Sequence, residues 1–392
     1  MIKLNLLVLF VALSLTYAQS PVPQDAKLEL LATGFQQPEG PVWSDSLGLL
    51  FSDIIANILY QWSPVDSSLT KYLSHSDSSN GLTYDLQGRL ILTQMELRRV
   101  ARQEFDGTIT PLASTYKGKR FNSPNDVVVK SDGSIFFTDP TFNIPLGQHQ
   151  ELPYAGIYRI SPFGNVTLLD STLNLPNGIC FSPDETKLYV NDSQARIIYV
   201  WDVVDDSTIV DKRLFYRIPG GNSDYADGMK VDPDGNIFCT GTKGVWIFSS
   251  GGTLLDTILV PSNPSNCNWG DADRKTLYIT AGHSIYRIRL ADTTTTDVKD
   301  HGSIPGNYKL YQNYPNPFNP NTTIRFTLPQ SGFTRLEIFN ELGNKIQDLV
   351  NRYMTRGNYN VNFNASNYAS GVYYYKLASS NFTSTGKMVY LK

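Results

Sequence analysis

Apolar segments of strand length recur along the first three quarters of the chain, and each follows a polar turn. The turn-and-strand unit appears six times between residues 46 and 280, and a second apolar segment follows each one, as at residues 58–62, 156–160 and 284–288. The segments are short, rich in Ile, Leu, Val, Tyr and Phe, and bounded by Gly, Asp or Ser. This pattern predicts β-strands rather than helices.

The spacing of the six units predicts the fold. Neighbouring units begin roughly 40 to 50 residues apart, the length of one four-stranded blade of a β-propeller. A single such sheet cannot bury both faces, whereas six packed around an axis do so and leave only short edges. We therefore predict an all-β fold with a six-bladed β-propeller over residues 19–290. Residues 28–33 precede the first unit, and we expect them to close the ring as the outer strand of the last blade.

The chain changes character after the sixth unit. Residues 291–307 are polar and Thr-rich, which predicts a linker. From residue 308 a second module begins, with strand-like segments at residues 334–339 and 371–377 and a turn at residues 341–344. This pattern predicts a small C-terminal β-sandwich over residues 308–392.

One position ahead of each unit carries only carboxylates and side-chain amides. It is the second residue of a segment such as Pro38-Glu39-Gly or Pro176-Asn177-Gly. The six residues are Glu39, Asn80, Asn125, Asn177, Asp227 and Asn266. If these segments are the innermost strands, the six side chains converge on the propeller axis, and their oxygens suit a hard cation such as Ca²⁺ or Mg²⁺. The alternative is that Asn-Gly and Asp-Gly are ordinary turn residues.

Charge and hydropathy limit which partners the protein can bind and where in or outside the cell it is expected. With 33 Lys and Arg against 36 Asp and Glu, the formal net charge is −3 and no basic block exists, so we expect no nucleic-acid partner. Residues 1–18 combine Lys3, an apolar core at residues 6–15 and a small-residue cleavage site ending at Ala18, which predicts a secretory signal peptide. No later apolar run is long enough to cross a bilayer, so we predict no membrane span.

The three cysteines are Cys180, Cys239 and Cys267. An odd number in an exported protein leaves at least one thiol unpaired, and the spacing matches no zinc motif. We expect them to be buried small side chains near strands, although the sequence also allows a Cys239–Cys267 disulfide.

The propeller region resembles the SMP-30/gluconolactonase/LRE family over about residues 30–290. The resemblance is carried by residues 38–43, 118–133, 138–140, 156–160, 175–184, 226–232 and 276–281. It implies a six-bladed propeller that opens sugar lactones or related esters with a bound divalent cation. We expect that cation to be Ca²⁺, with Mg²⁺, Mn²⁺ or Zn²⁺ as alternatives.

The resemblance also implies roles for the converging residues. By position, Glu39, Asn177 and Asp227 match the family's metal ligands, and Asp227 also matches its acid/base. Asn125 matches a residue that contacts substrate or water on the metal. We therefore place Asn125 among both the metal ligands and the substrate-binding residues, and we assign Asn80 to substrate binding as well.

One stretch departs from the family. Many bacterial gluconolactonases carry Glu-His-Gly before a pair of arginines, here Arg98 and Arg99, whereas this chain has Gln94-Met95-Glu96. If that histidine binds sugar lactone there, its replacement by Met95 leaves the exact lactone open. The alternative is neutral drift of a loop.

The C-terminal module resembles the sorting domain of the Bacteroidota-type (type IX) secretion system. Its first residues, 314–320, and the strand at residues 371–377 carry the resemblance. It implies that secretion machinery recognises residues 308–392, and that the protein passes through the periplasm of a bacterium to be secreted or held at the cell surface. The alternative is an Ig-like binding module.

These assignments predict a mechanism. The cation would polarise the lactone carbonyl and stabilise the developing oxyanion. Asp227 would accept a proton from the attacking water and then help to protonate the leaving ring oxygen. Two alternatives stay open. One is a non-catalytic secreted propeller that binds protein or glycan around a structural cation, and the other is hydrolysis of a phosphotriester or aryl ester in the same site.

Overall fold

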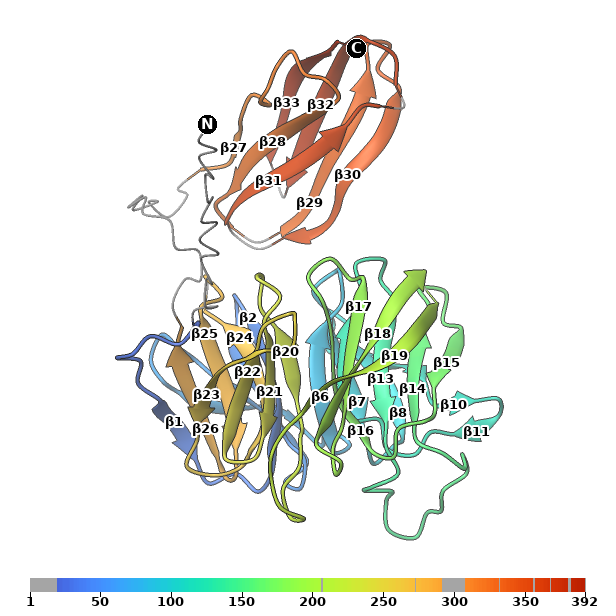
Figure 1. Cartoon of the computed structure of the whole chain (residues 1–392), viewed down its shortest axis with the longest axis vertical. Helices are drawn as coiled ribbons and strands as arrows, with labels where there is room; N and C mark the ends of the chain where they lie inside the picture. The colour runs from blue at the N-terminus through green and yellow to red at the C-terminus, as the bar shows by residue number, and fades with distance from the viewer. Residues whose placement is uncertain are drawn as a thin grey trace, which may run out of the picture.

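The structure, a computed structural model, describes residues 20–391 apart from residues 206, 272, 291–306, 331, 355–356, 367 and 380–381. The predicted signal peptide and almost all of the predicted linker lie outside these residues. Every named element in the described part is a β-strand, and six four-stranded sheets precede two sheets of a C-terminal module (Figure 1). None of the described residues form a helix long and apolar enough to cross a membrane.

Each of the six sheets is one antiparallel blade, and the strand given first for each blade below is an edge strand of its sheet. Blade 1 consists of β2 (Pro38–Ser44), β3 (Gly48–Asp53), β4 (Ile58–Trp62) and β5 (Leu69–Ser74). Blade 2 consists of β6 (Ser79–Tyr84), β7 (Leu90–Gln94), β8 (Arg99–Gln103) and β9 (Ile109–Ala113). After the small hairpin of β10 (Thr115–Tyr116) and β11 (Lys119–Arg120), blade 3 consists of β12 (Val127–Val129), β13 (Ile135–Asp139), β14 (Gly156–Ile160) and β15 (Val166–Asp170).

The second half of the ring repeats this order. Blade 4 consists of β16 (Pro176–Phe181), β17 (Lys187–Asp192), β18 (Ile197–Asp205) and β19 (Thr208–Arg217). Blade 5 consists of β20 (Met229–Val231), β21 (Ile237–Gly241), β22 (Gly244–Phe248) and β23 (Leu254–Leu259). Blade 6 consists of β24 (Pro264–Gly270), β25 (Thr276–Ala281), β26 (Ser284–Arg289) and β1 (Glu29–Thr33).

The N-terminal strand closes the ring, as predicted. β1 pairs antiparallel with β26, the last propeller strand in the chain, and an ion pair of 2.7 Å joins Arg287 Nε to Glu29. The outer edge of blade 6 is therefore built from residues more than 250 positions earlier in the sequence. This pairing ties the two ends of the propeller together and fixes the number of blades at six.

The core of the propeller lies between neighbouring blades. The first strands of the six blades are spatial neighbours in order, and β2 also adjoins β24, so together they form a closed inner ring. Apolar side chains from adjacent blades interlock behind this ring. Phe238 and Ile247 of blade 5, for example, pack in one buried cluster with Leu277 and Ile279 of blade 6. Both faces of a blade are thereby removed from water, which a lone sheet cannot achieve.

The Asn-Gly pairs are part of this inner ring, so the interpretation of them as turns is wrong for Asn80-Gly81 and Asn177-Gly178, which lie within β6 and β16. Their glycines are required by the close approach of the next blade. A Cβ at Gly178 would lie 2.3 Å from the Asp227 carbonyl oxygen, and one at Gly81 would lie 2.6 Å from that of Asn125.

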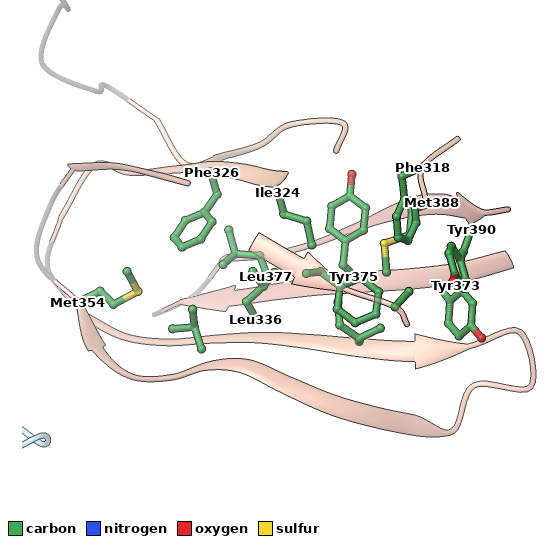
Figure 2. Close-up of a cluster of buried hydrophobic side chains, with 14 of the residues drawn as sticks. Phe318, Ile324, Phe326, Leu336, Met354, Tyr373, Tyr375, Leu377, Met388 and Tyr390 are labelled. Carbon is green, nitrogen blue, oxygen red and sulfur yellow. The ribbon is translucent and has the colours of Figure 1, made fainter. Parts of the chain in front are cut away.

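The C-terminal module is the predicted β-sandwich. One sheet has the order β27 (Lys309–Leu310), β28 (Asn321–Leu328) and β31 (Gly357–Asn364). The other has the order β30 (Lys345–Met354), β29 (Gly332–Asn340), β32 (Gly371–Ser379) and β33 (Phe382–Tyr390). Figure 2 shows how side chains of both sheets, such as Ile324 and Phe326 on one and Leu336 and Leu377 on the other, enclose a core of their own.

We predict that Gly178→Ala destabilises the propeller by about 2 kcal/mol, because the new methyl group overlaps the backbone of Asp227 and overpacking of this kind costs about 1–3 kcal/mol. The free energy of unfolding of the chain without residues 1–18 would be measured by urea titration. Gly251→Ala is the matched control, since a Cβ there meets only Ser249 Oγ, at 3.8 Å. Equal stability of the two variants would contradict the close inter-blade contact.

Candidate active site

A cavity of about 390 Å³ opens where the innermost strands begin. Five of the six converging residues line it: Glu39, Asn80, Asn125, Asn177 and Asp227. Glu39, Asn80 and Asn177 lie near the starts of their innermost strands, whereas Asn125 and Asp227 stand two residues ahead of β12 and β20. Residues from five blades, nearly 190 positions apart in the chain, therefore share one cavity on the propeller axis.

The sixth residue, Asn266, corrects the expectation that all six side chains reach the same point. Asn266 is not among the residues that line the cavity; its Nδ2 donates to Glu39 Oε2 at 2.9 Å. Gly228 makes room for this arrangement, because a Cβ there would lie only 2.0 Å from Asn266 Oδ1. Asn266 thus holds the Glu39 carboxylate rather than offering its own oxygen to a ligand.

In five of the six blades, one polar side chain donates a hydrogen bond to the backbone at or beside the next blade's converging residue, and we call the side chains at this position the inter-blade donors. The donor is the penultimate residue of each blade's second strand. Its hydrogen bonds run from Ser52 to the Asn80 carbonyl, Thr93 to Asn125, Thr138 to Asn177, Asn191 to Asp227 and Thr240 to Ser265. In blade 6, Thr280 and Ser265 share a hydrogen bond of 2.8 Å, and Ser265 Oγ donates to the Pro38 carbonyl beside Glu39.

The inter-blade donors were missed by sequence reasoning, although a signal exists. Aligning the six units places a Ser, Thr or Asn at the same position in each, at the end of an otherwise apolar strand. A polar side chain that recurs inside a buried strand needs a hydrogen-bond partner. Here the partner is the backbone that positions the cavity residues.

Buried carboxylates next to the donors brace the segments that lead into the cavity. Asp53 accepts the N–H groups of Gln36 and Gln37, both at 2.9 Å. Asp139 accepts those of Asn122 and Ser123 in the same way, at 2.8 and 2.7 Å. Because the side-chain oxygens of both aspartates already accept hydrogen bonds from backbone amides, we assign Asp53 and Asp139 a structural role.

Burial disfavours the charged forms of the two carboxylates in the cavity, Glu39 and Asp227. Removal from water raises the pKa of Glu39 from 4.5 to about 7, against the opposing effect of hydrogen bonds from Asn266 and Gly40. The pKa of Asp227 also lies well above its ordinary value, first because of desolvation and then because of the negative charge of Glu39. Hydrogen bonding to Asn177 partly offsets this rise. Two desolvated acidic groups in one cavity, one of which raises the pKa of the other, favour a bound proton or cation.

A buried ion pair adjoins this acidic pair. Lys230 Nζ lies 3.6 Å from Asp126 Oδ2, and the Asp126 side chain is only 2% exposed. The positive charge of Lys230 lowers the pKa of Glu39, while Asp126 raises it. Because Lys230 and Asp126 offset each other, Glu39 and Asp227 are left as the net charge of the cavity. No local pattern predicts this pair, because Asp126 directly precedes β12 of blade 3 and Lys230 lies in β20 of blade 5.

The donor atoms present fit a hard divalent cation. The Oδ1 atoms of Asn80 and Asn177 are buried and have no hydrogen-bond partner, which is costly unless a ligand satisfies them. Among the described residues, no group of three or more His, Cys, Asp or Glu side chains is arranged for a metal, so any axial ion would rely on two carboxylates and side-chain amides. All-oxygen sets of this kind suit Ca²⁺ or Mg²⁺ better than a soft metal.

Met95 lies beside the cavity residues rather than in an exposed loop. Its side chain is buried, and Asn80 Nδ2 donates to its Sδ at 3.5 Å. This contact turns the amide nitrogen of Asn80 away and leaves Oδ1 without a partner. The residue that departs from the family pattern therefore orients one of the cavity's oxygens.

The three thiols are free and buried, as expected for small core side chains. Cys180, Cys239 and Cys267 lie in β16, β21 and β24, and the disulfide that the sequence allowed between Cys239 and Cys267 is not formed. Burial raises the pKa of the Cys267 thiol to about 12, which keeps it protonated and unreactive.

The fold and the cavity define a six-bladed propeller with a polar, acidic site on its axis. Residues 37–283 match the family described as the SMP-30/Gluconolactonase/LRE-like region, and the chain belongs to this family. Residues 312–391 match the family described as the secretion system C-terminal sorting domain. The resemblances inferred from the motifs are thus confirmed for both parts of the chain.

Individual relatives share most of the propeller. A gluconolactonase from Zymomonas mobilis is 33% identical over 296 residues, which cover 67% of this chain and 81% of that protein. The pentonolactonase XacC from Haloferax volcanii is 26% identical over 247 residues, covering 62% and 80%. Among solved structures, a gluconolactonase from Xanthomonas campestris has a TM-score of 0.64 at 33% identity, and the match covers 68% of this chain and 90% of that one.

The raised pKa of Glu39 predicts how stability depends on pH without metal. The folded state binds this proton more tightly than the unfolded chain, so its contribution is complete below pH 4.5 and is lost as the pH rises through about 7. The total is about 3 kcal/mol. We expect a higher melting temperature at pH 5 than at pH 8 in chelator, and a smaller difference in Glu39→Gln. Glu341→Gln, in an exposed turn, is the control, and an unchanged difference in Glu39→Gln would contradict the assignment.

Proposed function

We propose that this propeller is a lactonase-type hydrolase that opens a sugar lactone or a related ester. The observation that carries the proposal is the pairing of two strongly desolvated carboxylates with unpartnered amide oxygens in one axial cavity. Membership of the SMP-30/gluconolactonase/LRE-like family supports it, as do relatives that are named gluconolactonase and pentonolactonase.

A divalent cation would be held by Glu39, Asn177 and Asp227, with Asn125 beside them. Their oxygens favour Ca²⁺, and Mg²⁺, Mn²⁺ and Zn²⁺ are the alternatives to be compared. When bound, the cation supplies Lewis-acid polarisation of the lactone carbonyl. Its charge would also offset the two negative charges that Glu39 and Asp227 impose on each other.

Asp227 is the proposed general base and acid. It lines the cavity and is partly exposed there, whereas Glu39 is buried and already accepts two hydrogen bonds. The inter-blade donor Asn191 fixes the Asp227 backbone, so the carboxylate has a defined position. Asp227 would take a proton from the attacking water as the water oxygen bonds to the carbonyl carbon. It would return that proton to the ring oxygen as the ester bond breaks.

The lining of the cavity favours a hydroxylated substrate over an apolar ester. Most ligand pockets are lined mainly by apolar side chains. Here Asn80 and Asn125, which we assign to substrate binding, are accompanied by further amide and hydroxyl side chains: Gln37, Asn143, Ser193, Tyr225, Asn263 and Ser265. An apolar ligand would displace water from these polar groups and leave them without hydrogen-bond partners. The hydroxyl groups of a sugar lactone can instead hydrogen-bond to them.

The C-terminal module bears on where the enzyme is delivered. Its match to a secretion system sorting domain indicates export to the cell surface or the medium. We infer that the secretion machinery recognises residues 308–392 after passage through the periplasm, and that the propeller of residues 19–290 is the cargo. A sugar lactone encountered outside the cell would then be the substrate.

We predict that Asp227→Asn lowers the turnover of D-glucono-δ-lactone by about 10²-fold or more, the usual scale for loss of a general base. The chain without residues 1–18 would be assayed after chelation and after adding back Ca²⁺, Mg²⁺, Mn²⁺ or Zn²⁺. Asn keeps one oxygen for the cation, so metal binding should persist while turnover falls. Asp234→Asn, in an exposed turn of the same blade, is the matched control.

Two results would overturn the proposal. Unchanged turnover in Asp227→Asn would remove Asp227 as the base. Metal binding by the unaltered chain without turnover of any lactone or ester would leave a structural cation, and the propeller would then be a binding platform for protein or glycan.

A further inference from the structure

Two segments outside the blades complete the wall of the axial cavity. The long loop at residues 140–155, between β13 and β14, contributes Phe142 and Asn143. The segment at residues 218–228, between β19 and β20, contributes Tyr225. The two segments belong to blades 3 and 5, on either side of the blade that carries Asn177. Phe142, Asn143 and Tyr225 lie outside the position that the six repeats share, so the repeats do not dictate these wall residues.

Equivalent arginines anchor both segments. Arg98 Nη1 of blade 2 donates to the His149 carbonyl at 3.1 Å, within the loop of blade 3. Arg196 Nη1 of blade 4 donates to the Gly221 carbonyl at 2.8 Å, within the segment that enters blade 5. Each arginine stands just before the third strand of its blade with a φ of 55°. The wall residues are therefore carried on segments that the preceding blade holds in place.

The Tyr225 hydroxyl is available to a ligand. Its side chain is half-buried and lines the same cavity as Glu39 and Asp227, and within the described residues its hydroxyl has no hydrogen-bond partner. A phenol hydroxyl can donate one hydrogen bond to a ligand that enters the cavity.

We propose that Tyr225 is a specificity-determining residue whose hydroxyl donates a hydrogen bond to a ring hydroxyl of the substrate, with Phe142 and Asn143 forming the rest of the selective wall. This inference rests on the proposed lactonase function and deepens it. Hydroxylated six-membered lactones are favoured over the same ring without hydroxyls. A site built to hydrogen-bond a substrate hydroxyl rejects the analogue that lacks it, because its own polar group is then left unpaired.

The test compares D-glucono-δ-lactone with δ-valerolactone, which has the same ring and no hydroxyls. In Tyr225→Phe, kcat/KM for gluconolactone should fall about tenfold, the factor that one hydrogen bond supplies, while kcat/KM for δ-valerolactone stays within about twofold. Tyr199→Phe, on β18 away from the cavity, is the matched control and should change neither. Calcium affinity should be the same in all three proteins, because Tyr225 is not a proposed ligand.

Three outcomes would overturn the inference. Unchanged selectivity in Tyr225→Phe would show that the hydroxyl does not select. An equal fall in kcat for both lactones would place the phenol on the reacting carbonyl instead. A loss of calcium affinity would place it in the cation site.

A parallel binding measurement separates this inference from the proposed function. D-gluconolactam and δ-valerolactam, analogues that are not opened, would be titrated calorimetrically into the unaltered chain and into Tyr225→Phe. If the unaltered chain turns over no lactone, the proposed function fails, yet a tenfold loss of gluconolactam affinity in Tyr225→Phe would still support selection by Tyr225. If the unaltered chain binds neither lactam, the inference fails as well.

Discussion

The hydrogen bond that each blade gives to the backbone of the next is the constraint on which the axial site depends. Thr138 Oγ1, for example, donates to the Asn177 carbonyl at 2.7 Å, and Ser52 Oγ donates to that of Asn80 at 2.8 Å. A polar side chain of one blade thereby sets the position of a site residue in its neighbour. The hydrogen bond from Ser265 of blade 6 to the Pro38 carbonyl of blade 1 makes the set of contacts continuous around the ring.

This rigidity explains how the cavity tolerates its own charges. Glu39 and Asp227 are desolvated and repel each other, which folding alone would not favour. The close backbone contacts at the ring glycines and the inter-blade donors hold them together nonetheless. A site of this kind would need little rearrangement to accept a positive charge.

Much of this could be predicted from the sequence, because the propeller is periodic. The six repeats predicted the blades and the closing strand, and alignment of one position across them predicted five residues that line the cavity. The features of the site that the sequence did not predict are those that do not repeat from blade to blade. The contact of Asn266 with Glu39, the pair of Lys230 with Asp126, and the place of Tyr225 in the wall all join residues distant in the chain, and their geometry follows from packing that no local pattern encodes.

The most direct test of the axial site is a crystal structure of the chain soaked in Ca²⁺, with the ion located by its anomalous signal. A single ion on the axis is expected, with oxygens of Glu39, Asn177 and Asp227 at about 2.3–2.6 Å. An axial cavity that stays free of metal at millimolar Ca²⁺, or an ion bound only elsewhere on the protein, would contradict the account. The converging carboxylates and amides would then have another purpose than to hold a cation.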